Sequence, residues 1–253
     1  MPRYVLRLEY DGAPFVGWQR QAEGLSVQQA LEEAAAHLVG GAAVEAAAAG
    51  RTDSGVHASG QVAQIDLPRV IDGETLRDAL NFHARPHPIA VLAAARAPEG
   101  FHVRFSAIGR AYRYRILDRR APPALERGRV WHVPRPLDAE AMHRAAQALI
   151  GRHDFSSFRA AACQASGPVR TLDRLDIARV GEEIVVETAA RSFLHHQVRN
   201  MVGSLRRVGD GSWTVAEIAR VLAAADRREA GQTAPPEGLT LTEVRYPDGL
   251  CPV

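Results

Sequence analysis

The sequence predicts an α+β protein in which helices pack on largely antiparallel sheet. Segments with period-two alternation come in runs, and single segments with helical spacing interrupt those runs. Both halves of the 253-residue chain contain these ingredients, without any tandem repeat of sequence. The proline-rich segment from Ala121 to Pro136 is the natural divide, so we expect two halves, residues 1–120 and 121–253.

The first half opens with a strand, because large apolar residues recur at every second position from Tyr4 to Tyr10. Ser26 and Gln29 form a capping box, which predicts a helix that continues at apolar spacing to Leu38. The alanine-rich residues after this helix favour a short strand, since glycines flank them. The remaining elements of this half are expected as follows: strands over 42–49, 61–67 and 89–95, and a helix over 75–82.

The second half has a strong amphipathic pattern from Phe193 to Val208, which predicts a helix. Thr214 and Glu217 form a second capping box, and a hairpin is expected to turn at Gly181. The elements expected in this half are strands over 112–117, 169–180, 183–189 and 239–246, and helices over 138–150, 193–208 and 214–225.

Composition excludes several classes of protein. No apolar run approaches the roughly 20 residues of a membrane span. The first ten residues alternate charged and apolar side chains, unlike a signal or transit peptide. Cys163 and Cys251 are too few for a disulfide framework or a cysteine metal site. We therefore expect a protein of the reduced cytoplasm, without membrane association.

All 31 basic residues are arginines, which excludes a Schiff-base lysine and a phosphate-binding loop of the G-K-[ST] type. The arginines cluster: residues 101–120 contain six of them with one acid, and residues 191–210 contain four, with two histidines and one acid. These stripes are compatible with an RNA-binding face and equally with ordinary solvated basic surfaces.

Gly50 to Ala58 reads G-R-T-D-S-G-V-H-A. An aspartate between glycines usually forms an Asx-turn or caps a helix. Alternatively, Asp53 is the carboxylate of a catalytic loop. Arg51 lies two positions away, so in an extended segment it would project to the same side and keep the carboxylate ionised. A positioned, ionised carboxylate can act as a nucleophile or a general base.

Two other places in the chain combine arginines with groups that suit nucleotide binding. Tyr112 alternates with arginines on a strand, where it is either a core residue or a platform on which a base stacks. His195 and Arg199 are four residues apart on the expected helix, so they would share a face. That face is either solvated or part of a cleft. No further metal ligands accompany the histidines, so we expect no metal site.

Six strings occur in order along the chain: E-Y-D-G-A-P-F-V-G-W-Q-R-Q, G-R-T-D-S-G-V-H-A-S-G-Q-V, F-H-V-R-F-S-A-I-G-R-A-Y-R-Y-R-I, D-F-S-S-F-R, F-L-H-H-Q-V-R-N-M-V-G-S-L and G-L-T-L-T-E-V-R-Y-P. Together they resemble the signature of the TruA-type tRNA pseudouridine synthases (tRNA pseudouridine synthase I). The resemblance runs from about Tyr4 to Pro247.

This resemblance implies two structurally related halves, each a mainly antiparallel sheet with helices on one face, joined around a central RNA-binding cleft. It implies a cofactor-free homodimeric isomerase that converts uridine to pseudouridine at positions 38, 39 and 40 of the tRNA anticodon stem-loop. By motif, Asp53 matches the catalytic nucleophile and Arg51 the arginine that helps to extrude the target base. Tyr112 matches the tyrosine that packs on the uracil, and Arg199 the arginine that pairs with the catalytic carboxylate.

Three other functions are weighed against this one. A catalytically silent tRNA-binding protein of the same fold would need the arginines but not Asp53. A carboxylate-dependent glycoside hydrolase would need a second acid, and the nearest in sequence are Glu45 and Asp66. A related synthase that acts on other RNA positions is the third alternative.

Overall fold

The computed structural model describes all residues from Met1 to Val253. Contacts divide the chain into two units. The first unit comprises Met1–Arg110 together with Thr240–Val253, and the second unit comprises Ala111–Leu239. The last strand of the chain is therefore part of the first unit, and each unit contains both helices and strands.

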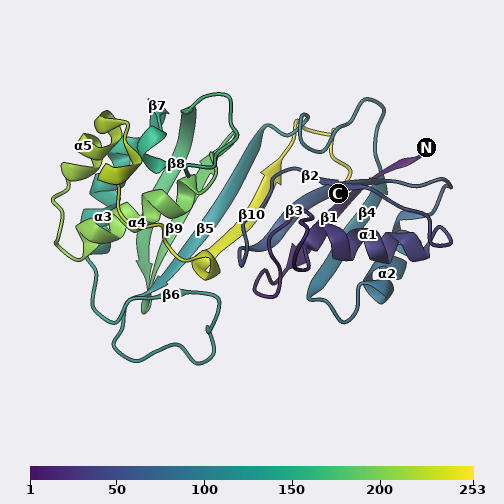
Figure 1. Ribbon diagram of the computed structural model, residues 1–253, viewed down its shortest axis with the longest axis horizontal. Coiled ribbons are helices and arrows are strands. Elements are labelled where there is room, and N and C mark those ends of the chain that lie inside the picture. Colours follow the sequence, from purple (N-terminus) through teal and green to yellow (C-terminus); the bar gives the residue numbers. More distant parts are fainter. The chain divides into compact units, whose positions relative to one another are not determined.

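The first unit is a sheet with two helices on one face. Its strands run in the order β4-β1-β3-β10, and β2 pairs with β3. All of these pairs are antiparallel except that of β10 with β3. Figure 1 shows α1 and α2 together beside this sheet. The elements are β1 (Arg3–Tyr10), α1 (Val27–His37), β2 (Ala46–Ala48), β3 (His57–Asp66), α2 (Gly73–His83), β4 (Ile89–Arg96) and β10 (Leu239–Arg245).

Strand β1 is buried on one face and partly covered on the other. The four residues that alternate from Tyr4 to Tyr10 are each at most 4% exposed, as the pattern predicts. Val5, on the opposite face, packs with Val62, Phe101 and the returning C-terminal segment. Tyr246 of that segment donates a hydrogen bond of 2.7 Å to the Val103 carbonyl. The C-terminal residues therefore cover the part of the second face that lies around Val5, whereas Arg7 and Glu9 on that face stay exposed.

The second unit repeats the combination of sheet and helices. Its strands run in the order β5-β9-β8-β7, with β6 beside β5, and α3, α4 and α5 lie together next to them (Figure 1). The elements are β5 (Gly109–Leu117), β6 (Trp131–His132), α3 (Ala139–Ala146), β7 (Gly151–Asp154), β8 (Val169–Val180), β9 (Glu183–Ala190), α4 (Gln197–Gly209) and α5 (Glu217–Ala224), with short 3-10 helices at Gln147–Leu149, Ser156–Phe158, Arg227–Glu229 and Pro236–Gly238.

The predicted α+β class is confirmed, and most predicted elements are present. The hairpin of β8 and β9 turns at Gly181, whose φ is +60°, and Ser26 accepts the Gln29 N–H at the start of α1. The second capping box is wrong, because the Thr214 side chain caps nothing; only its carbonyl accepts the Glu217 N–H. Strands β6 and β7 were not expected from the sequence. No helix of the structure has the length and apolar character that a membrane crossing requires.

Helix α4 begins later than its apolar pattern predicts. The pattern starts at Phe193, but the first helical residue is Gln197. His196 has a φ of +62°, in the left-handed region, and the His195 carbonyl accepts a hydrogen bond from Ala160 instead of from the helix. The residues before Gln197 therefore form an irregular segment that leads into the helix.

A glycine permits the segment after α5 to cross α4 at close range. A Cβ on Gly203 would lie 1.8 Å from the carbonyl oxygen of Gln232. Asn200, one turn earlier, donates to the Phe158 carbonyl at 2.9 Å and accepts the Thr233 hydroxyl at 2.7 Å. These contacts therefore connect α4 both to the segment that contains Phe158 and to the segment that contains Gln232 and Thr233.

Directly after the C-terminal end of β5, a buried carboxylate joins three segments of the second unit. Asp118 accepts two hydrogen bonds from Arg179, at 2.8 and 2.7 Å, and one of 2.9 Å from the Leu137 N–H. Burial alone would raise the pKa of the Asp118 carboxyl, but the hydrogen bonds from Arg179 and Leu137 outweigh it, so this pKa lies below its usual value.

We predict that Gly203→Ala destabilises the protein by about 3 kcal/mol or more, because main chain must move to admit the methyl group. Urea unfolding followed by circular dichroism measures this loss. Gly167→Ala is the matched control, since nothing lies within 4 Å of its Cβ position. A Gly203→Ala protein as stable as Gly167→Ala would contradict the close crossing.

We predict that Asp118→Asn costs about 1–3 kcal/mol of stability at pH 7, because Arg179 loses its charged partner. The folded-state pKa of Asp118 is depressed, so its contribution is present above the unfolded pKa of about 3.9 and is lost as the pH falls through the folded pKa. Urea titrations at pH 7, 5, 4 and 3 should show the difference between wild type and variant shrinking below pH 4.

Asp78→Asn serves as the control for that experiment. The Arg77–Asp78 pair has a comparable distance of 2.8 Å but is solvent-exposed, and exposed pairs contribute little. Equal losses for the two variants at pH 7, or a difference for Asp118→Asn that stays constant down to pH 3, would argue against the buried ion pair.

Candidate active site

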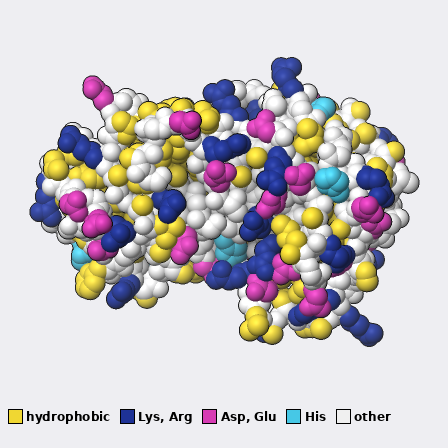
Figure 2. Space-filling view, turned by 180° about the vertical axis from the view of Figure 1, so that it is seen from behind, with side chains coloured by type: hydrophobic (Ala, Val, Ile, Leu, Met, Phe, Trp, Pro, Cys, Tyr) yellow, Lys and Arg dark blue, Asp and Glu magenta, His cyan; other side chains and the backbone are white.

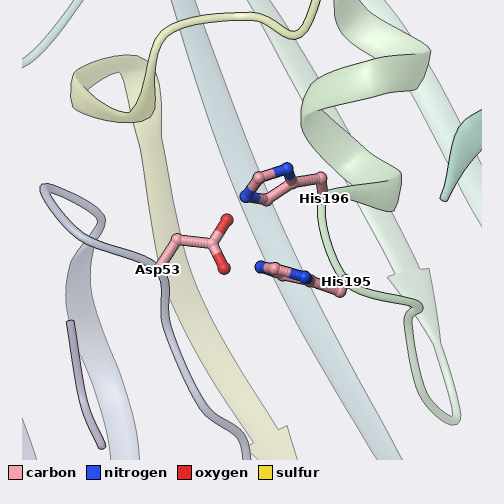
Figure 3. A group of neighbouring side chains, drawn as sticks. All are labelled: Asp53, His195 and His196. Carbon is pink, nitrogen blue, oxygen red and sulfur yellow. The ribbon is translucent and has the colours of Figure 1, made fainter. Parts of the chain in front are cut away.

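Asp53 lies on the loop between β2 and β3, in the first unit, and its carboxylate projects away from the loop main chain (Figure 3). Exposure alternates along this stretch: Arg51 is exposed, Thr52 is only 6% exposed and Asp53 is half-buried. Such alternation is typical of extended backbone, in which successive side chains point to opposite sides. Arg51 and Asp53 therefore lie on the outer side of the loop and Thr52 on the inner side.

The loop ends in a tight turn immediately after Asp53. The Val56 N–H donates a hydrogen bond of 3.1 Å to the Asp53 carbonyl, which closes a four-residue turn. Gly55 has a φ of +75°, a conformation that glycine adopts without strain. Gly50 has no such φ, so only the second glycine of the motif is required by backbone geometry. The expected turn is present, and it is closed by main chain.

The segment after β1 packs directly on this loop. A Cβ on Gly17, whose φ is +108°, would lie 2.7 Å from the Thr52 carbonyl oxygen. The Trp18 N–H donates to that same oxygen at 3.0 Å, and the Gly55 N–H donates to the Phe15 carbonyl at 3.3 Å. The strings E-Y-D-G-A-P-F-V-G-W and G-R-T-D-S-G-V are therefore in main-chain contact with each other.

A buried arginine holds the beginning of the loop. Arg110 is 8% exposed and donates hydrogen bonds to the carbonyls of Ala49 at 2.7 Å, Arg104 at 3.1 Å and Ala107 at 3.4 Å. It thereby links the F-H-V-R-F-S string to the residue that precedes Gly50. One of the six arginines between residues 101 and 120 thus has a structural role inside the protein.

The pairing expected between Arg51 and Asp53 is not formed. The Arg51 side chain is exposed and makes no ion pair with the carboxylate. Both groups leave the loop on its outer side, where the guanidinium is accessible to a bound molecule. Arg51 is therefore available for interactions with a ligand.

Tyr112 and Arg199, the other two predicted site residues, lie in the second unit. Tyr112 is half-buried on β5, and its ring meets that of Phe193 edge to face, with centroids 5.3 Å apart. Tyr114, two positions along, is completely buried and donates its hydroxyl to the Pro235 carbonyl. Of the two tyrosines, Tyr114 is the core residue, and Tyr112 keeps part of its ring accessible.

Arg199 lies in the first turn of α4, half-buried. Its Nε donates to the Ala234 carbonyl at 2.8 Å, and the Ala234 N–H donates back to the Arg199 carbonyl at 3.1 Å. The crossing segment therefore fixes both the main chain and the guanidinium of this residue. The predicted helical pairing of His195 with Arg199 is wrong, because His195 precedes the helix.

His195 and His196 lie in the irregular segment that leads into α4 (Figure 3). Their ring centroids are 4.0 Å apart, and the planes are tilted by 47°. Imidazoles exchange protons near neutral pH and bind metals, so the pair is chemically versatile. The sequence pattern predicted no specific role for either residue.

Much of the arginine-rich stripe in the second unit is neutralised by acids. Arg113 pairs with Glu187 at 2.8 Å, and Arg115 pairs with Glu183 at 2.7 Å. Glu187 also pairs with Arg174, and its pKa lies below the usual value chiefly because of the hydrogen bond from Arg113. Figure 2 shows arginine side chains spread over the face in view, several of them beside acidic groups. Local sequence composition therefore overstates the positive charge of this stripe.

The second acid that a glycoside hydrolase would need is not supplied by Asp66. That residue ends β3 and is bound in a two-pronged ion pair by Arg3, at 2.9 and 3.0 Å. At about 3.3 Å per residue, the length of β3 separates it from the Asp53 loop by roughly 30 Å.

Comparisons with known proteins identify the family of this chain. The sequence profile of the family described as tRNA pseudouridine synthase matches residues 8–106 and 145–247. The chain is 63% identical to tRNA pseudouridine synthase A of Acidiphilium cryptum (strain JF-5), over 97% of each chain. It is 60% identical to the proteins of that name from Paramagnetospirillum magneticum (strain ATCC 700264 / AMB-1) and Rhodospirillum centenum (strain ATCC 51521 / SW), over 97% of this chain and 96% and 100% of theirs. The chain therefore belongs to the tRNA pseudouridine synthase family.

Proposed function

We propose that this protein isomerises uridine to pseudouridine at positions 38, 39 and 40 of the tRNA anticodon stem-loop, with Asp53 as its nucleophile. The observation that carries the proposal is the Asp53 loop: in a member of this family, it presents a carboxylate on main chain held by Gly17, Trp18 and Arg110. A reacting group held in one geometry avoids the entropic cost of orientation during the reaction.

The other three residues have complementary roles in this proposal. A uridine in a stem-loop must leave the base stack to be reached, which costs a few kcal/mol. Arg51, exposed beside Asp53, helps to extrude the base and takes its place. Tyr112, with part of its ring accessible, packs on the extruded uracil. Arg199, fixed by Ala234, pairs with the catalytic carboxylate.

The reaction conserves atoms and needs no redox partner. Asp53 attacks either the ribose C1′ or the uracil ring, and the bond between uracil N1 and C1′ breaks. The base turns, a bond forms between C5 and C1′, and the bond to Asp53 breaks so that the carboxylate is regenerated. The hydrogen on C5 leaves as a proton while N1 gains one. Uridine and pseudouridine therefore have the same composition, and the enzyme is an isomerase.

We also propose that the protein acts in the cytoplasm as a homodimer. The resemblance of its six strings to the family supports the dimer. A tRNA substrate and the lack of a disulfide framework support the compartment.

We predict that Asp53→Asn abolishes the release of tritium from tRNA carrying 5-tritiated uridine, while wild type releases it from the anticodon arm. The amide has nearly the shape of the carboxylate but is not nucleophilic, so tRNA binding should persist in a filter-binding assay. Turnover by Asp53→Asn at the wild-type rate would refute the assignment. Loss of tRNA binding by the variant would show that Asp53 contributes to recognition rather than to chemistry alone.

We predict that the dissociation constant for tRNA rises steeply with salt, because arginines that contact phosphates release counterions. Arg51→Gln should weaken binding and lower the slope of log K against log salt, because the tRNA site loses one exposed positive charge. Arg220→Gln is the control, since Glu217 and Glu229 already neutralise that arginine. A response that does not change with salt would contradict an arginine-lined tRNA site.

A further inference from the structure

A buried tyrosine lies directly beneath the Asp53 loop. Thr52, between Arg51 and Asp53, turns its side chain inward and places Oγ1 2.8 Å from the hydroxyl oxygen of Tyr10. Tyr10 ends β1 and is 4% exposed. Its ring also lies beside that of Trp18, with centroids 6.4 Å apart, so the phenol is fixed by packing as well as by hydrogen bonds.

Gln61 of β3 adds two hydrogen bonds to this network. Its Nε2 donates to the Gly50 carbonyl at 2.8 Å and to the Tyr10 hydroxyl at 3.3 Å. The Gln61 side chain is completely buried. The loop is thus held both at its first glycine and at Thr52, one residue before the carboxylate.

The Tyr10 hydroxyl takes part in two hydrogen bonds. Its oxygen accepts from Gln61, and it shares a hydrogen bond with the Thr52 hydroxyl in which either oxygen can be the donor. Burial disfavours the phenolate and raises the pKa of Tyr10 to about 12. Tyr10 therefore remains a neutral hydroxyl throughout the range of pH in which the enzyme would work.

We propose that Tyr10 is a positioning residue for Asp53, acting through Thr52. In extended backbone the side chain of one residue determines the side to which its two neighbours point. With Thr52 bonded inward to Tyr10, Arg51 and Asp53 both point outward. The inference rests on the proposed role of Asp53 as nucleophile. It adds that Tyr10 and Thr52 together hold the Asp53 carboxylate in position.

The same strand supplies a matched control. Tyr4 is also buried on β1, and its hydroxyl donates to the Ile71 carbonyl at 2.9 Å and accepts the Ile71 N–H at 2.7 Å. Those bonds hold the chain before α2, not the Asp53 loop. Tyr4→Phe and Tyr10→Phe therefore remove equivalent buried hydroxyls from one strand, and only the second touches the loop.

The experiment compares single-turnover tritium release by wild type, Tyr10→Phe, Thr52→Val, the double variant, Thr52→Ser and Tyr4→Phe. Tyr10→Phe and Thr52→Val should slow release about tenfold to a hundredfold, without changing the dissociation constant for tRNA. The double variant should be no slower than the slower single variant, because both remove one interaction. Thr52→Ser, which keeps the hydroxyl, and Tyr4→Phe should stay within about twofold of wild type.

Amide hydrogen exchange gives a readout that does not depend on activity. The N–H groups of Trp18 and Val56 donate to Thr52 and Asp53, so they report on the order of the loop. They should exchange faster in Tyr10→Phe than in wild type and be unchanged in Tyr4→Phe.

The two readouts separate the possible failures. Release by Tyr10→Phe and Thr52→Val at the rate of Tyr4→Phe would overturn the positioning role, as would unchanged exchange of both amides in Tyr10→Phe. A wild-type protein that releases no tritium would overturn the proposed function and, with it, the catalytic part of this inference. The amide exchange rates of Trp18 and Val56 would then still show whether Tyr10 orders the loop.

Discussion

The close main-chain contact between Gly17 and residues 52–54 is the constraint on which the candidate active site depends. A side chain at position 17 would occupy the place of the Thr52 carbonyl oxygen, and the φ of +108° there already suits only glycine. The Trp18 N–H and the Phe15 carbonyl can form hydrogen bonds with the loop only because these two segments of the chain approach so closely. The main chain of the loop is thereby ordered by backbone contacts, and Arg51 and Asp53 project from its outer side.

Sequence pattern predicted the elements that are long and regularly alternating, and it failed where tertiary contacts decide the backbone. Strands β6 and β7 have two and four residues, too few for a period to be visible. The apolar stripe of α4 continues back to Phe193, but the left-handed conformation of His196 starts the helix at Gln197. Nothing in the local sequence announces that conformation, because the hydrogen bond from Ala160 comes from another segment.

The candidate site was predictable in part, because the residues proposed for its chemistry lie in recognisable strings, whereas the residues that support them do not. Asp53 and Arg51 stand out as polar residues between glycines, but Tyr10 and Gln61 look like ordinary members of alternating strands. The local sequence likewise does not show which arginines are neutralised by acids. Arg113 is neutralised by Glu187, 74 residues later, so a local count of arginines could not reveal the pairing. Contacts between distant residues, rather than local chemistry, limit what the sequence can predict.

The parallel pairing of β10 with β3 has a consequence for the order in which the protein is made. The chain leaves the first unit after Arg110 and returns to it at Thr240, so its sheet lacks one strand until residues 240–245 have been synthesised. The second unit is complete earlier, within one continuous stretch. During translation the edge of β3 that pairs with β10 therefore stays open while roughly 170 residues emerge, at 5–20 residues per second. For those seconds the strand that follows the Asp53 loop is exposed to aberrant pairing, a vulnerability that the finished fold conceals.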